Sequence, residues 1–208
     1  SLGSKKVGNY CLGGPLIFDV DVKTTGIYGD ETIEKGVTAI FSLEEFLNKR
    51  YGFDNFACAF SGKRGFHLYV RDFDPRNFGN EYGQQSTELI EKNLRTKIAK
   101  EVIDKEFTID AQVTTDTRRI VRLPNTLHGG SGFLSLYLES KDELDRFNLS
   151  KSLVFPSDIL IKIKLVKRTP RISIDSIIVD LADSKKEVEV PMSVAILLLL
   201  SGYAVITH

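Results

Sequence analysis

The segment PLIFDVDVK, residues 15–23, constrains the fold more than any other part of the chain, because its apolar and polar residues alternate strictly. Such alternation predicts a β-strand with one face on a hydrophobic core and the other toward a polar space. The apolar face would carry Leu16, Phe18, Val20 and Val22. The opposite face would carry Ile17, Lys23 and two acids, Asp19 and Asp21. The two carboxylates are therefore expected to point the same way.

The rest of the sequence mixes helix and strand patterns. Helices are expected over 42–50, where Ser42 and Glu45 form a capping-box pattern before a stop at Gly52, over about 87–105, from Ser140, and after Pro191. Strands are expected over 56–60, 66–70, 108–114, 119–123, 133–138, 159–166, 172–179 and 203–207. This order predicts an α/β (α+β) fold of mixed β-sheets with flanking helices. Since the chain has neither internal repeats nor a low-complexity linker, it is expected to be a single domain, 1–208.

Composition limits the classes of protein and of site. Lys and Arg number 28, as do Asp and Glu, so the net charge is zero and a broad basic surface for nucleic acid is not indicated. Any enzyme of nucleic acids with this composition would need a local basic groove or a partner. Cys11 and Cys58 have no other Cys or His nearby, so we expect buried free thiols and neither zinc nor an iron–sulfur cluster.

No feature of the sequence indicates secretion or a membrane span. The first residues lack a basic segment followed by an apolar run, and the apolar stretch 194–200 is far shorter than the roughly 20 residues of a spanning helix. An intracellular, cytoplasmic location is expected.

Asp19 and Asp21 are the first candidates for chemistry. Two carboxylates on one strand face can bridge two divalent ions, and ligand sets made only of oxygen favour Mg²⁺ or Mn²⁺. A pair of alternating acids is more often a solvated strand face, so the motif alone does not establish a metal site.

The second candidate is SGKRGFH, residues 61–67, at the tip of a predicted hairpin. Gly62 and Gly65 would leave backbone N–H groups free to surround an anion, while Ser61, Lys63 and Arg64 add a hydroxyl and two charges. His67 would follow on the second strand of the hairpin. The plainer alternative, slightly favoured for this motif alone, is a basic surface turn whose glycines serve only the hairpin.

The third candidate is the segment 109–133, IDAQVTTDTRRIVRLPNTLHGGSGF. Asp110 could complete a two-metal site, and Arg122 with His128 could hold a triphosphate. Asp116 is more simply explained by a local pair with a neighbouring arginine.

Taken together, FDVDVK, SGKRGFH and the 109–133 segment closely resemble, in order and spacing, the motifs of archaeal and eukaryotic DNA primase small (catalytic) subunits of the archaeo-eukaryotic primase superfamily. The resemblance implies a core with an RRM-like half around a cleft. It implies that the catalytic, metal-binding carboxylates are Asp19, Asp21 and Asp110. It implies that the nucleotide is bound by Ser61, Gly62, Lys63, Arg64, His67, Arg122 and His128.

The implied function is template-directed nucleotidyl transfer that makes primers for DNA replication, with two Mg²⁺ or Mn²⁺ ions. The implied partners are nucleoside triphosphates, a single-stranded DNA template with its primer, and a primase large subunit or a fused large-subunit domain. Family members usually carry a longer segment before the first motif and a zinc-binding Cys/His module. Here 18 residues precede Asp19 and no Cys/His set is present, so a minimal catalytic domain is expected.

Two alternatives remain open from the sequence. One is another primase-polymerase of the same superfamily, acting in end joining or plasmid replication. The other is a catalytically silent nucleotide-binding assembly subunit, which would gain nothing from a cluster of like charges.

Overall fold

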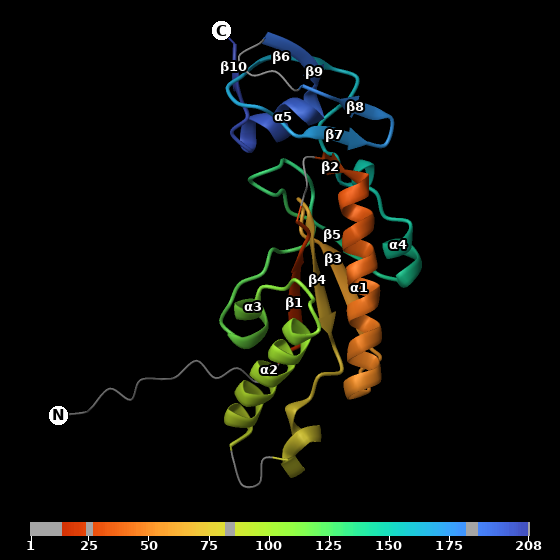
Figure 1. The fold of residues 1–208 in the computed structure, drawn as a ribbon, viewed down its shortest axis with the longest axis vertical. Coiled ribbons are helices and arrows are strands. Elements are labelled where there is room, and N and C mark those ends of the chain that lie inside the picture. Colours follow the sequence, from red (N-terminus) through yellow and green to blue (C-terminus); the bar gives the residue numbers. More distant parts are fainter. Residues whose placement is uncertain (1–13, 24–26, 82–85, 182–186, 208) are drawn as a thin grey trace, which may run out of the picture.

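The computed structural model describes residues 14–23, 27–81, 86–181 and 187–207. The molecule is elongated, with the C-terminal strands at one end of its long axis and helix α2 near the other (Figure 1). The fold is an α/β arrangement of β-sheets with flanking helices, as the sequence predicted, and most of its strand pairs are antiparallel. Cys11 lies outside the described residues, and Cys58 is a buried free thiol, as expected.

The central sheet confirms the strand and hairpin predictions. Strands β1 (Leu16–Asp21), β4 (Gly65–Val70), β3 (Phe56–Phe60) and β5 (Leu136–Leu138) pair in that order, each antiparallel to its neighbour. The apolar face of β1 is buried as predicted, because Leu16, Phe18 and Val20 are at most 4% exposed. The predicted strand 133–138 is shorter than expected and begins at Leu136.

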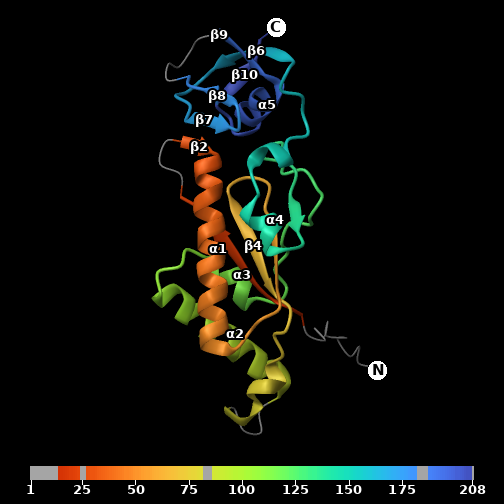
Figure 2. The same ribbon diagram turned by 90° about the vertical axis from the view of Figure 1, so that its right-hand side faces the viewer.

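Two long helices contribute to the hydrophobic cluster that buries the apolar face of β1. Helix α1 (Asp30–Tyr51) lies along the sheet (Figure 2). Helix α2 (Thr87–Asp104) agrees with the predicted 87–105 helix and is capped by Ser86. The predicted start of α1 was wrong. Ser42 lies inside the helix, because the apolar spacing continues upstream through Ile33 and Val37, whereas the end before Gly52 is confirmed.

The chain order β1–α1–β3–β4–α2, with β4 between β1 and β3, is the arrangement expected of an RRM-like half. Only a remnant of a further strand lies on the outer edge of β1, where Ile109 forms an isolated bridge with Val20. The predicted strand 108–114 was therefore wrong. Asp110 instead caps the short helix α3 (Ala111–Thr115), which turns the chain away from the sheet.

The predicted strand 119–123 was also wrong, since these residues have no regular structure. Ile120 is 94% exposed, so no neighbouring strand covers it. The short helices after this loop are α4 (Lys141–Asp145), which begins at Ser140 as predicted, and η2 (Leu149–Ser152). A further short helix, η1 (Pro75–Glu81), follows β4.

The C-terminal part forms two small sheets. Strands β10 (Ala204–Ile206), β6 (Leu160–Leu165) and β9 (Glu187–Pro191) form one antiparallel sheet, beside the buried helix α5 (Met192–Leu200) predicted after Pro191. The predicted strand 172–179 is a hairpin of β7 (Arg171–Ile174) and β8 (Ile177–Val179). Strand β2 (Ile27–Gly29), which directly precedes α1, pairs in parallel with β7 and so joins the two parts of the molecule.

Asp30 reinforces this junction at the first turn of α1. Its carboxylate accepts hydrogen bonds from the backbone N–H groups of Leu149 at 3.1 Å and Asp175 at 2.5 Å. Across the described ranges, no helix is both long and apolar enough to cross a bilayer.

Candidate active site

The polar face of the central sheet carries the first two predicted acids. Asp19 lies opposite His67 in the β1–β4 ladder, and Asp21 lies opposite Gly65. Because both acids are on one strand face, their side chains share the space above the hairpin. The Asp19 side chain is 29% exposed and that of Asp21 is 58% exposed, so Asp19 lies deeper.

Asp110 is brought to these acids by the backbone. Its N–H donates to the carbonyl oxygen of Asp19 at 2.9 Å, beside the bridge between Ile109 and Val20. One oxygen of its carboxylate accepts a hydrogen bond from the N–H of Gln112 at 2.9 Å, as the cap of α3. After α2 the chain therefore returns to β1 and brings Asp110, the third predicted acid, next to Asp19.

The three carboxylates interact electrostatically. Burial raises the pKa of Asp19 to about 6, and repulsion from Asp21 and then Asp110 adds to the effect. A divalent cation would relieve this repulsion. A donor set made only of carboxylate oxygens suits a hard cation such as Mg²⁺ or Mn²⁺. In the part of the chain that the structure describes, however, no three His, Cys, Asp or Glu side chains are already gathered as a metal site. The assignment of the three acids as metal ligands therefore stays a prediction.

The SGKRG tip is turned toward the acids. The Arg64 guanidinium lies 3.5 Å from a carboxylate oxygen of Asp21. The tip is closed by a hydrogen bond from Ser61 N–H to the Gly65 carbonyl at 2.9 Å. At Gly65, a Cβ atom would lie 2.8 Å from the Asp21 carboxylate and 2.8 Å from the Val20 carbonyl, so only glycine lets the tip approach the acids this closely.

The loop before β5 packs against this tip. His128 and Phe133 are linked by a backbone hydrogen bond of 2.8 Å, and the Ser131 hydroxyl donates to the Gly62 carbonyl at 2.5 Å. At Gly62 the φ angle is +93°, and a Cβ atom would lie 2.7 Å from the Cβ of His128. Gly62 therefore brings the two loops together, while its own position is not on the cavity wall.

His67 and His128 differ from the charged residues around them. Burial, with the nearby Arg122 charge, lowers the pKa of His67 to about 4. Partial burial, Arg122 and Lys63 also lower the pKa of His128. Both imidazoles are thus neutral at neutral pH and would act on a ligand through hydrogen bonds.

The tautomer of His128 follows from its surroundings. Its Nδ1 accepts a hydrogen bond from the N–H of Gly130 at 3.0 Å, which leaves the proton on Nε2 as a donor. The Nε2 of His67 lies 3.6 Å from a carboxylate oxygen of Asp19, which is too long for a hydrogen bond, and its buried Nδ1 has no partner among the described residues.

A cavity of about 410 Å³ lies between the acids and the hairpin tip. Its predicted lining residues are Asp19, Asp21, Ser61, Lys63, Arg64, His67, Arg122 and His128. The acids and the cations thus face the same space, from segments far apart in the sequence. Asp110 and Gly62 do not line the cavity, but each adjoins a residue that does, Asp19 and His128 respectively.

Sequence reasoning missed four residues of this region. Val113, Ile120 and Val121 line the cavity, and the Tyr28 hydroxyl donates to the Lys63 carbonyl at 2.6 Å. Ile120 and Val121 carried a usable signal, since they are apolar residues within an arginine-rich run. Tyr28 carried none, because its contact depends on how β2 meets the hairpin tip, 35 residues further along the chain.

Comparison with known proteins identifies the family of this chain. The sequence profile of the family described as DNA primase small subunit matches residues 18–140, which include every predicted site residue. The chain belongs to the DNA primase small subunit family.

Three archaeal relatives show the extent of the similarity. The chain is 27% identical over 167 residues to the DNA primase small subunit PriS of Pyrobaculum arsenaticum, a match covering 63% of this chain and 54% of that protein. It is 29% identical over 147 residues to the PriS of Saccharolobus islandicus, covering 59% and 40%. It is 22% identical over 213 residues to the PriS of Archaeoglobus fulgidus, covering 76% and 63%. The chain thus spans about half the length of the curated relatives it matches.

Proposed function

We propose that this chain is the catalytic part of a DNA primase, which transfers nucleotides to a growing primer as directed by a single-stranded DNA template. The observation that carries the proposal is the cavity in which Asp19 and Asp21 face Lys63, Arg64 and Arg122. Acids and cations around one space suit a metal–triphosphate complex, whose ions need carboxylates and whose phosphates need positive charge.

The acids would hold the ions. Asp19 and Asp21 share one strand face, and Asp110 is linked to Asp19 through its backbone, so these residues would bind two Mg²⁺ or Mn²⁺ ions. Bound there, the ions would supply activation of the primer 3′-hydroxyl and neutralisation of the phosphate charge. Because Asp19 is partly buried and repelled by its neighbours, ion binding would also remove an electrostatic cost of the folded state.

The basic wall would hold the triphosphate. Lys63 and Arg64 project from the hairpin tip and Arg122 from the facing loop, so the phosphates would be held from two sides. His128 would donate a hydrogen bond from Nε2, and Ser61 one from its hydroxyl. The fixed positions of Gly62 and Gly65 pre-organise this wall, which is the main requirement of phosphoryl-transfer sites.

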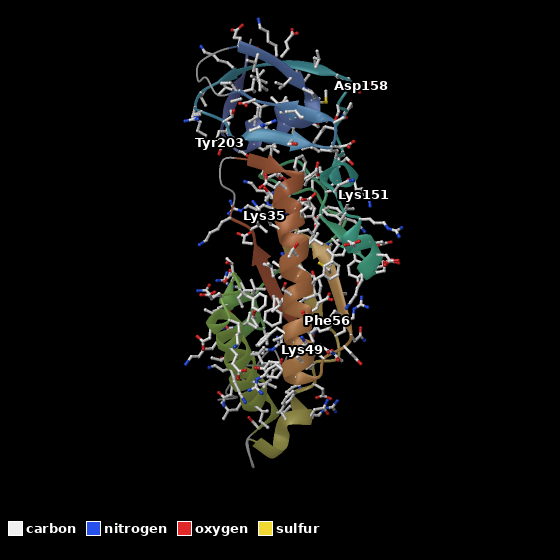
Figure 3. The ribbon with its side chains drawn as sticks, turned by 45° about the vertical axis from the view of Figure 1, so that its right-hand side comes forward. Lys35, Lys49, Phe56, Lys151, Asp158 and Tyr203 are labelled. Carbon is white, nitrogen blue, oxygen red and sulfur yellow. The ribbon has the colours of Figure 1, made fainter. Side chains whose placement is uncertain are left out.

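The enzymatic test is primer synthesis on single-stranded DNA with nucleoside triphosphates and Mg²⁺ or Mn²⁺, with and without a candidate large subunit. Asp21→Asn should abolish nucleotide addition. Asp158→Asn is the matched control, because this acid is exposed and lies among the C-terminal strands (Figure 3). Near-normal extension by the Asp21 variant would contradict the proposal. De novo dinucleotide synthesis compared with filling of a primed gap would separate a primase from an end-joining polymerase.

A further inference from the structure

A second and larger cavity, of about 580 Å³, lies where the central sheet meets the C-terminal sheets. Its walls come from the hairpin tip, from the segment that leads into β7, and from α5 with the residues that follow it. A volume of this size admits a phosphate-bearing small molecule with its hydration water.

The charge of this cavity is strongly positive. Four cations line it, Lys63, Arg64, Arg168 and Arg171, against the single acid Asp180. Within the described ranges, neither Arg168 nor Arg171 has a carboxylate at ion-pair distance. Arg168 and Arg171 are exposed and free to turn toward the cavity, and several guanidinium groups around one space attract an anion, so the lining points to an anionic ligand.

This cavity is adjacent to the candidate active site. Lys63 and Arg64 line both cavities, whereas Asp19 and Asp21 line only the first. Tyr28 is buried and holds the Lys63 carbonyl, so the hairpin tip forms a fixed wall between the two spaces. An anion released by Lys63 and Arg64 would therefore find Arg168 and Arg171 on the side away from the acids.

We propose that the second cavity binds the pyrophosphate that leaves after nucleotide transfer, an inference that rests on the proposed function. In that reaction the 3′-oxygen of the primer forms a bond to the α-phosphorus, and the bond between the α-phosphorus and the bridging oxygen to the β-phosphorus breaks. The proton of the 3′-hydroxyl goes to solvent, and pyrophosphate is the leaving group. Arg168 and Arg171 then draw pyrophosphate away from the acids, which favours release over the reverse reaction.

The test uses the whole chain and the double variant Arg168→Gln/Arg171→Gln. Pyrophosphate binding is measured by calorimetry in the presence of Mg²⁺, and steady-state primer extension is measured in parallel. Loss of two charge-assisted contacts should weaken pyrophosphate binding by about tenfold or more. The KM for the nucleoside triphosphate should stay unchanged, because Lys63, Arg64 and Arg122 remain.

Two further variants show whether the effect is specific. Arg146→Gln removes an exposed arginine that lines neither cavity and should leave pyrophosphate binding as in the wild type. Arg168→Lys/Arg171→Lys keeps the charge and should retain most of the binding. Unchanged thermal unfolding of all variants would show that the fold is intact.

Unaltered pyrophosphate affinity in the Gln double variant would overturn the inference. So would a variant that loses affinity for single-stranded DNA or for the nucleoside triphosphate while it keeps pyrophosphate binding. The proposed function is tested separately by nucleotide addition. If it is wrong, the wild-type chain adds no nucleotides, whatever affinity for pyrophosphate calorimetry gives.

Discussion

Asp19 has an environment that opposes its own ionisation. It is partly buried, faces the buried His67, and is repelled by two further acids. A group whose folded pKa of about 6 exceeds its unfolded value of 3.8 binds more protons in the folded state between these two pH values. The free energy of unfolding therefore falls as pH rises through this window, and the full cost is present above about pH 6.

Asp19→Asn should thus abolish nucleotide addition and at the same time stabilise the fold at neutral pH. The expected gain is on the order of 1–2 kcal/mol, allowing for partial solvent screening. Thermal unfolding at about pH 7.5 and again at about pH 4 measures it, and the gain should disappear at the lower pH, where wild-type Asp19 is protonated. A variant that is less stable than the wild type at neutral pH would refute this account of Asp19.

His128 gives a second prediction, in which affinity rather than chemistry is affected. Because its Nε2 is a neutral donor at the basic wall, His128→Ala should remove one hydrogen bond to the triphosphate. The KM for the nucleotide should rise by roughly tenfold, with a smaller effect on kcat. Steady-state primer extension gives both values, and a large fall in kcat at unchanged KM would show that the residue acts on the transition state instead.

Arg95, a buried residue of helix α2, links the two segments that carry the three acids. Arg95 is 3% exposed, pairs with Glu91 at 2.8 Å and lies over the ring of Phe73. Its guanidinium also donates to the carbonyl oxygens of Gly14 at 3.0 Å and Pro15 at 3.2 Å, just before β1, and to that of Thr114 at 3.5 Å in α3. Arg95 therefore holds the helix that Asp110 caps against the strand that carries Asp19 and Asp21.

Arg95→Met should lower the free energy of unfolding by about 3–5 kcal/mol, because it leaves Glu91 buried without its partner. Glu91→Leu/Arg95→Met should regain much of that stability, while nucleotide addition and Mn²⁺ affinity stay reduced because the three carbonyl contacts are lost. Urea unfolding and Mn²⁺ binding measure the two effects. Full activity in the stable double variant would show that Arg95 serves the fold alone.

The β3–β4 hairpin gives a further prediction at this scale. In Gly65→Ala, the new Cβ would meet the Asp21 carboxylate and the Val20 backbone, so the hairpin tip must move away from the acids. Nucleotide addition should fall by about 100-fold, as expected for a displacement near 1 Å in a pre-organised site. Gly129→Ala is the matched control, since a Cβ there meets nothing within 4 Å. Equal activity of the two variants would contradict the role given to Gly65.

Across the whole molecule, the sequence predicted what local patterns determine. The alternation of β1, the hairpin around residues 61–65 and the cap at Ser140 depend on neighbours in the chain, and all three were confirmed. The predicted start of α1 was wrong because Ser42, although it has a capping pattern, lies in the middle of a helix whose apolar face is continuous. The strand prediction for 108–114 was wrong because the side chain of Asp110 accepts a hydrogen bond from the backbone N–H of Gln112 and so caps a helix.

The remaining features depend on contacts between distant segments. Arg95 reaches backbone atoms about 80 residues earlier in the chain, and the second cavity combines the hairpin tip with α5 and β7. No local sequence pattern predicts contacts between segments so far apart in the chain. The three site segments were recognised from their resemblance to the primase family, whereas the contacts of Arg95 and the second basic cavity are seen only in the three-dimensional structure.

Acids from β1 and from the α2–α3 connection are proposed to form one metal–nucleotide site with the basic residues of the hairpin tip and the facing loop. Equilibrium binding of Mn²⁺, followed by its paramagnetic resonance signal with and without a nucleoside triphosphate, measures whether they do. The nucleotide should strengthen Mn²⁺ binding in the wild type. Asp19→Asn and Asp110→Asn should each abolish this coupling, while Asp158→Asn should preserve it. Wild-type coupling in the Asp110 variant would place that acid outside the site and refute the proposal.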